Sequence, residues 1–214
     1  NIWLNTINDP EMPNLASNLL SSGIIYKSRL FFLAFSFIGL FLYILRSKNT
    51  LLYLQILLFF GQAFLMPPIR KLGDTSRQLP LRNISKQILN VRKGGETLAM
   101  IGIRKPSLHF YTKQIVFYES SAAEGLVNLF ERFKFDRRIN FQDIPNYDNE
   151  YFLVVIDKYS SRKEHWLNIN HQKLGVYGIY NLWRIKKSDL NAQATNLVSN
   201  GFEANWRNKK VEKF

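Results

Sequence analysis

Two long apolar runs dominate the first third of the chain. Residues 30–45 and 51–69 contain no charged side chain, and only the polar segment 46–50 separates them. A helix needs about 17 to 25 residues to cross the roughly 30 Å hydrocarbon core of a bilayer, because each residue adds only about 1.5 Å. The pattern predicts a transmembrane hairpin over residues 29–71, with spans at about 30–45 and 51–69.

The first run is short for a span. It reaches the required length if Lys27, Arg29 and Arg46 lay their aliphatic stems in the apolar layer and extend their charges to the headgroups. The alternative is a buried hairpin inside a soluble core, which would be an unusual use of two almost wholly apolar helices. The charges that flank the spans do not decide which side the 46–50 loop faces.

Polar and small residues interrupt both apolar runs. Ser36 and Gly39 lie in the first run, and Gln55 and Gln62 lie in the second. Lipid offers no hydrogen-bond partner, and small or amide-bearing positions allow helices to approach and bond across a contact. We therefore expect the hairpin to have protein neighbours, namely further transmembrane helices of the same protein.

Residues 1–28 form a mixed segment before the hairpin. After an aromatic and aliphatic start, residues 8–10 give a turn signal, and Pro13 opens a predicted amphipathic helix that lies along the headgroups. Asp9 and Glu11 are the right residue types for an acid–base pair, but they lie in a Pro-rich turn. We expect both carboxylates to point to solvent.

After the hairpin the pattern alternates between strands and helices. Pro67 and Pro68 are expected to end the second span, and residues 72–80 are expected to form a polar linker. Buried strands are predicted at residues 97–103, 115–118 and 151–156, and a closing pair at 174–177 and 182–185. Helical segments are predicted at 81–91, 107–111 and 126–133 and within 158–170.

This alternation predicts the α/β fold class. The expected arrangement is the two-helix transmembrane hairpin followed by a small soluble α/β domain, residues 80–190, with a largely parallel sheet. Residues 191–214 are polar and basic, and we expect a loosely ordered tail there.

The charge and composition of the chain restrict the classes of partner that it can bind. The formal net charge is +13, and after residue 69 the chain has 25 Lys or Arg against 14 Asp or Glu. Such a bias suits membrane lipid, phosphate-bearing substrates or nucleic acid, and the adjacent spans favour the first two. The absence of cysteine excludes disulfides and thiolate metal sites. The chain starts at Asn1 without an initiator Met or a signal sequence, so we expect a fragment of a longer protein.

The familiar catalytic and cofactor motifs do not fit. Gly94 and Gly95 precede a strand instead of joining a strand to a helix, which argues against a dinucleotide or ATP site. The three histidines lack the spacing that places two ligands on one helical face, so we predict neither a metal site nor a cofactor. Ser107 near His109 lacks the strand-to-helix elbow of a hydrolase nucleophile.

One segment has the composition of a ligand site. Residues 104–111, RKPSLHFY, follow the first predicted strand, where open α/β sheets tend to bind ligands. The candidate contacts to a phosphate or sugar are two cations, a residue at a helix N-terminus and an aromatic ring, namely Arg104, Lys105, Ser107 and Tyr111. The alternative is a solvated loop with Leu108 and Phe110 packed under the sheet.

The order of these features resembles the C-terminal part of bacterial membrane glycosyltransferases of the aminoarabinose-transferase type, which are related to the protein mannosyltransferases (GT-C type). The similarity covers residues 30–187, and residues 8–13, NDPEMP, look like the extracytoplasmic loop before the last spans. The family pattern E-x-L-x-M-x-G-x-x-K-P-S-L-x-F-Y is carried by Glu96, Leu98, Met100, Gly102, Lys105, Pro106, Ser107, Leu108, Phe110 and Tyr111.

The resemblance implies a multi-pass enzyme of the bacterial cytoplasmic membrane that moves a sugar from a polyprenyl-phosphate donor to a lipid or protein acceptor. In the family the catalytic carboxylate lies in the first extracytoplasmic loop, upstream of Asn1, and a divalent metal would also belong there. The α/β domain would be extracytoplasmic, with the 46–50 loop in the cytoplasm. We therefore expect the full-length protein to be active and this fragment alone to be inactive.

Two rival hypotheses remain. The first is a non-enzymatic, membrane-anchored module that binds anionic lipid or glycan through Arg104, Lys105 and the basic tail. The second is a membrane-tethered nucleic-acid binder, but the chain has no recognisable element that interleaves basic and aromatic residues for that purpose. We therefore expect no nucleic-acid partner.

Overall fold

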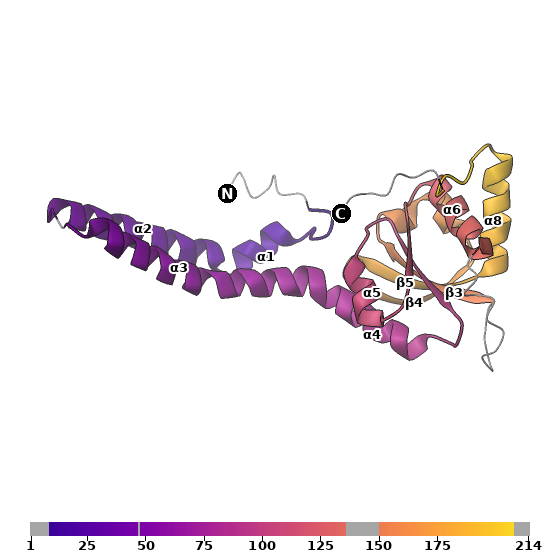
Figure 1. Cartoon of the computed structure of the whole chain (residues 1–214), viewed down its shortest axis with the longest axis horizontal. Coiled ribbons are helices and arrows are strands. Elements are labelled where there is room, and N and C mark those ends of the chain that lie inside the picture. The colour runs from indigo at the N-terminus through magenta and orange to yellow at the C-terminus, as the bar shows by residue number, and fades with distance from the viewer. Residues whose placement is uncertain (1–8, 47, 136–149, 208–214) are drawn as a thin grey trace. The chain divides into compact units, whose positions relative to one another are not determined.

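The computed structural model describes residues 9–46, 48–135 and 150–207. The chain divides into two compact units, residues 1–79 and 80–214. The first consists of helices, and the second is an α/β domain, so the predicted fold class is confirmed (Figure 1). Of the predicted segments, residues 1–8 of the N-terminal segment and residues 208–214 of the tail lie outside the described part.

The first unit is built around two long apolar helices. Helix α1 (Leu15–Ser21) precedes helix α2 (Ile24–Ile44), and helix α3 (Thr50–Gly73) follows. The 21 residues of α2 correspond to about 31 Å, because the helix starts before Lys27 and Arg29 instead of after them. Both α2 and the helix that begins at Thr50 are long and apolar enough to cross a membrane.

The two long helices pack through glycine. Gly61 of α3 is buried, and a β-carbon there would lie 1.8 Å from the Phe31 ring of α2. At Gly39 the side chain of Leu54 lies 3.5 Å from the position of a β-carbon, so Gly39 also belongs to this contact. Gln55 and Gln62 are exposed and therefore do not form it.

The expected stop at Pro67 and Pro68 is wrong, because both prolines lie inside α3. Each proline removes one backbone hydrogen bond, but membrane helices tolerate this where the neighbouring turns remain bonded. The expected linker at 72–80 is wrong too. Residues Asp74–Gln78 form a π-helical turn that connects α3 to helix α4 (Leu79–Val91). Pro80 cannot donate a backbone hydrogen bond, and π-helical turns accommodate such irregularities in the ladder.

Asp9 and Glu11 do not simply point to solvent. Arg77 contacts Asp9 at 2.7 Å and Glu11 at 3.5 Å, and both carboxylates are mostly covered. The expectation was wrong because the partner of Asp9, Arg77, lies 68 residues away in the sequence. This ion cluster joins the segment before α2 to the segment after α3.

We predict that this cluster opens in acid. The hydrogen bond from Arg77 holds the pKa of the Asp9 carboxyl below its ordinary value. A lowered folded-state pKa means that the contact is complete above about pH 4 and is lost as the pH falls through the folded-state value. A ¹³C titration of labelled Asp should find Asp9 shifted in the native protein and close to normal in Arg77→Gln. Arg70→Gln should leave the shift unchanged, and an unshifted Asp9 in the native protein would contradict the prediction.

The second unit contains a five-stranded sheet in the order β2-β1-β3-β5-β4. Its strands are β1 (Thr97–Ile101), β2 (Val116–Glu119), β3 (Tyr151–Asp157), β4 (His171–Tyr177) and β5 (Tyr180–Lys186). Strand β1 pairs parallel with β2 and β3, whereas β5 pairs antiparallel with β3 and β4. The sheet is therefore a parallel three-stranded half extended by an antiparallel hairpin.

Helices cover both faces of this sheet (Figure 1). On one face, α4 and the short helix α5 (Pro106–Thr112) pack on Leu98, Met100 and Val155. On the other face, helices α6 (Ala123–Phe135), α7 (Glu164–Leu167) and α8 (Lys187–Ser199) contribute to a second core with Phe152 and Val154. Alternate residues of β1 and β3 thus enter different cores, as strand geometry requires.

Helix α8 corrects the expected loose tail. Residues 191–199 belong to this helix, and Leu190, Ala194 and Leu197 are buried in the second core. The spacing of these three residues places them on one helical face. The polar composition between them had concealed that stripe.

Candidate functional site

The candidate site lies where the three parallel strands end. The connection from β1 to β2 contains α5, and the connection from β2 back across β1 to β3 contains α6. Helix α5 packs on one face of the sheet and α6 on the other, so the loops that leave β1 and β2 diverge at this edge. Open α/β sheets bind ligands at such a switch point.

The four residues predicted as contacts are brought together by one segment. Arg104 and Lys105 lie in the loop after β1, and Ser107 and Tyr111 lie in α5. Arg104 is exposed, and the other three are partly exposed. Helix α5 has only seven residues, so its N-terminus adds little to anion binding and the side chains must supply it.

The alternative packing of this segment is half correct. Leu108, on the inner side of α5, is fully buried, whereas Phe110 is 76% exposed. Helical periodicity explains the difference, because Leu108 and Thr112 are one turn apart on the inner face. Phe110 therefore points away from the core.

Tyr118 of β2 holds the loop that carries the two cations. Its hydroxyl donates a hydrogen bond to the carbonyl of Lys105 at 3.0 Å. Burial raises the pKa of the Tyr118 hydroxyl, so it remains protonated and able to donate at neutral pH. The backbone that positions Lys105 is thus fixed from the neighbouring strand.

Sequence reasoning missed a buried carboxylate at the same edge. Asp157 ends β3, and one of its oxygens accepts hydrogen bonds from the backbone nitrogens of Tyr159 and Ser160, both at 2.9 Å. The other oxygen accepts a hydrogen bond from the Ser160 hydroxyl. Gly102, with φ +85°, passes so close that a β-carbon there would lie 2.1 Å from that oxygen. An acidic residue at the end of the strand YFLVVID was the available signal.

The loops after β2 and β3 contact each other. The Ser121 carbonyl accepts a hydrogen bond from the Trp166 indole at 3.2 Å, and His165 Nε2 lies 2.7 Å from the same oxygen. The Lys163 ammonium donates to the Ser121 hydroxyl at 2.8 Å. His165 is therefore part of a structural contact between loops. Among the described residues, no group of three or more His, Cys, Asp or Glu is arranged to hold a metal.

The edge is electrostatically positive. On its described loops, four cations, Arg104, Lys158, Arg162 and Lys163, are exposed beside one exposed carboxylate, Glu164. The two carboxylates at the strand ends are buried instead: Asp157 is enclosed by its own turn, and Glu119 is paired with Arg132 at 2.6 Å. Because these two carboxylates are buried and hydrogen-bonded while the cations are exposed, the surface of this edge favours anions such as phosphate.

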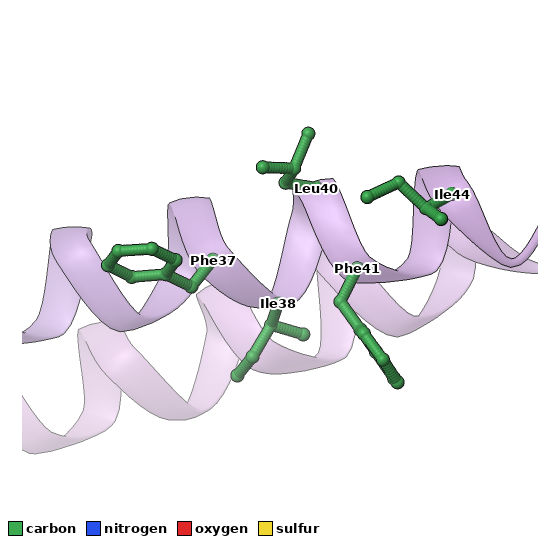
Figure 2. A pocket seen from close by; sticks show the side chains of 5 residues that line it. All are labelled: Phe37, Ile38, Leu40, Phe41 and Ile44. Carbon is green, nitrogen blue, oxygen red and sulfur yellow. The ribbon is translucent and has the colours of Figure 1, made fainter.

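A separate hollow lies on α2 of the first unit. Phe37, Ile38, Leu40, Phe41 and Ile44 line it, and Figure 2 shows that all five side chains project from this one helix. The lining side chains are all apolar, so the hollow offers contacts to a hydrocarbon chain or another apolar helix and no catalytic group.

A comparison with known protein families identifies the family of the α/β domain. The family model of the cyanobacterial RgtA-type glycosyltransferase C-terminal domain matches residues 91–201, more than half of the chain. No curated protein and no solved structure matched the chain. The match confirms the expected resemblance to the C-terminal part of a GT-C type membrane glycosyltransferase. The chain therefore belongs to the RgtA-type glycosyltransferase family, and residues 91–201 form the C-terminal domain characteristic of that family.

Proposed function

We propose that the full-length protein transfers a sugar from a polyprenyl-phosphate donor to a lipid or protein acceptor at the outer face of a bacterial cytoplasmic membrane. The observation that carries this proposal is the match to a glycosyltransferase C-terminal domain in a chain that also has two membrane-length apolar helices. In the reaction, an acceptor hydroxyl attacks the anomeric carbon while the bond from that carbon to the phosphate oxygen breaks. The departing polyprenyl phosphate takes the electron pair.

Residues 1–214 have a supporting role in this proposal. A carboxylate that accepts the proton of the acceptor hydroxyl is expected upstream of Asn1. The cationic edge of the α/β domain supplies positive charge for the phosphate or for an anionic acceptor, with Arg104 and Lys105 as the first candidates. Ser107 and Tyr111 add a hydroxyl donor and a ring on which a sugar can stack.

Exposed positions on α2 and α3 indicate that these helices belong to a larger transmembrane bundle. Gln55 and Gln62 present amides on faces of α3 that do not contact α2, and α2 has the apolar hollow described above. An exposed amide in hydrocarbon lacks hydrogen-bond partners unless another helix supplies them. We infer that upstream transmembrane helices of the same protein cover these faces.

The predicted contribution of the cationic loop can be measured by sugar transfer in the full-length protein. Changing both Arg104→Gln and Lys105→Gln should lower kcat/KM for the donor about 100-fold or more, because each charged hydrogen bond contributes about 1.5–3 kcal/mol and two are lost. The control changes Lys134→Gln and Lys173→Gln together, two exposed cations outside the candidate site. Equal activity of the two double variants would reject the loop as a contact site.

A further inference from the structure

The face of the α/β domain formed by α4 and α5 has an unusual charge pattern. Between residues 79 and 118 the chain contains seven Lys or Arg and a single acidic residue, Glu96. Glu96 is fully buried and bonded to Arg184, so it contributes no negative charge to the surface. The opposite face includes acidic residues on its helices, Glu124 and Glu131 of α6 and Asp189 of α8.

Helix α5 presents an exposed aromatic side chain on this face, Phe110. Phe110 lies on the side of α5 opposite the buried pair Leu108 and Thr112. His109 and Lys113 are exposed beside it, and Ile115, just after the helix, is 53% exposed. Exposed aromatic and aliphatic side chains close in sequence to a lysine are typical of a surface that inserts into the interfacial region of an anionic membrane.

The chain keeps this face within reach of a bilayer. Ten residues separate residue 69, the end of the apolar run, from Pro80, the start of the domain. Even a fully extended segment of that length spans at most about 40 Å. The domain therefore encounters the membrane surface at a high effective concentration, so a weak interfacial contact is sufficient for docking.

We propose that the α4–α5 face docks on the surface of a bilayer that contains anionic lipids, with Phe110 as the inserting side chain and Lys113 among the cations that bind headgroups. The proposal goes beyond sugar transfer, because it concerns how the domain is held against the membrane. The residues that test it, Phe110 and Lys113, lie outside the candidate phosphate or sugar contacts, so the two proposals fail separately.

The absence of cysteine makes a labelling experiment direct. A nitroxide attached to His109→Cys reports on the proposed face, and a nitroxide on Asn191→Cys of α8 is the control on the other face, since both positions are exposed. The full chain is reconstituted in phosphatidylcholine nanodiscs with and without phosphatidylglycerol. Collision with a water-soluble nickel relaxant and with oxygen is then measured by electron paramagnetic resonance.

The expected result is that label 109 loses contact with nickel and gains contact with oxygen only in anionic nanodiscs, while label 191 remains accessible to nickel. Lys113→Gln should reduce the ratio of docked to undocked domain about fivefold, since one cation near an anionic surface contributes about 1 kcal/mol. Phe110→Ser should reduce it about tenfold or more, because an apolar ring is no longer buried.

Three outcomes would overturn the proposal. The first is equal nickel access at label 109 in neutral and anionic nanodiscs. The second is shielding that Phe110→Ser leaves unchanged while tryptophan fluorescence reports a normal fold. The third is shielding produced by added RNA but not by anionic lipid, which would assign the cationic face to nucleic acid.

Discussion

Arg184→Met is expected to destabilise the α/β domain by about 3–5 kcal/mol, because the substitution leaves a buried carboxylate without its partner. Arg184 Nε contacts Glu96 Oε1 at 2.6 Å, and Glu96 is fully buried. The same guanidinium donates to the Val91 carbonyl, so it also holds the end of α4. Denaturant unfolding of the full chain in detergent, followed by the fluorescence of the buried residues Trp166 and Trp183, measures the change.

The matched control is Lys186→Met on the same strand. Lys186 contacts Glu150 at 2.6 Å, but both side chains are substantially exposed. Exposed ion pairs contribute little to stability, so this variant should unfold close to the native protein. Similar destabilisation by the two variants would show that burial of the Glu96–Arg184 pair does not matter, and would contradict the prediction.

Gly102→Ala is expected to be the second most damaging change, at about 2–4 kcal/mol. A β-carbon at this position would lie 2.1 Å from Asp157 Oδ2 and 2.4 Å from Ser160 Oγ. The turn after β3 must move, and the loop with Arg104 and Lys105 moves with Gly102. We therefore expect both a lower unfolding free energy and a loss of any ligand binding at this edge.

Gly201→Ala separates the two causes of that effect. Gly201 has nearly the same backbone angle, φ +88°, but a β-carbon there meets no atom within 4 Å. Its cost should be the backbone term alone, about 1–2 kcal/mol. If both alanine variants lose the same stability in the same unfolding measurement, the close approach of Gly102 to Asp157 is not what constrains this position.

The sequence predicted the regular elements where periodicity and length agree. The strand at 151–156 was located because its apolar run is uninterrupted, and the helix at 81–91 because its apolar residues recur at helical spacing. The wrong predictions came from local sequence patterns at positions whose structure depends on contacts with distant residues. Pro67 and Pro68 are local helix breakers, but the long apolar helix continues through them. Arg77 captures Asp9 and Glu11 from a distance that no local pattern reveals.

The candidate site was predicted only in part, because some of its residues are contiguous in the sequence and others meet only in the folded domain. Arg104, Lys105, Ser107 and Tyr111 are contiguous, so their common location after β1 follows from one strand assignment. Asp157 and Gly102 meet only because β1 and β3 are paired, and that pairing is a tertiary fact. The role of Tyr118 was hidden likewise, since its hydroxyl reaches Lys105 from the neighbouring strand.

The structure also assigns physical roles to the motif around β1. Glu96 anchors the start of the strand through Arg184, and Leu98 and Met100 fill the core beneath α4. Gly102 permits the tight approach to Asp157. Glu96, Leu98 and Met100 thus stabilise the amino end of β1 and the core, whereas Gly102 shapes the carboxyl ends of β1 and β3. Lys105 and Ser107 remain accessible at the carboxyl ends, where the proposed function requires them.

We propose that this chain is part of an enzyme that transfers sugar from a polyprenyl-phosphate donor. The most direct measurement uses the purified full-length protein in nanodiscs with a radiolabelled polyprenyl-phosphate-linked sugar and membrane acceptors, and follows release of polyprenyl phosphate and labelling of the acceptor. We predict both products with the full-length protein and neither with residues 1–214 alone. Failure of the full-length protein to release polyprenyl phosphate from any such donor, or turnover by residues 1–214 alone, would contradict the account.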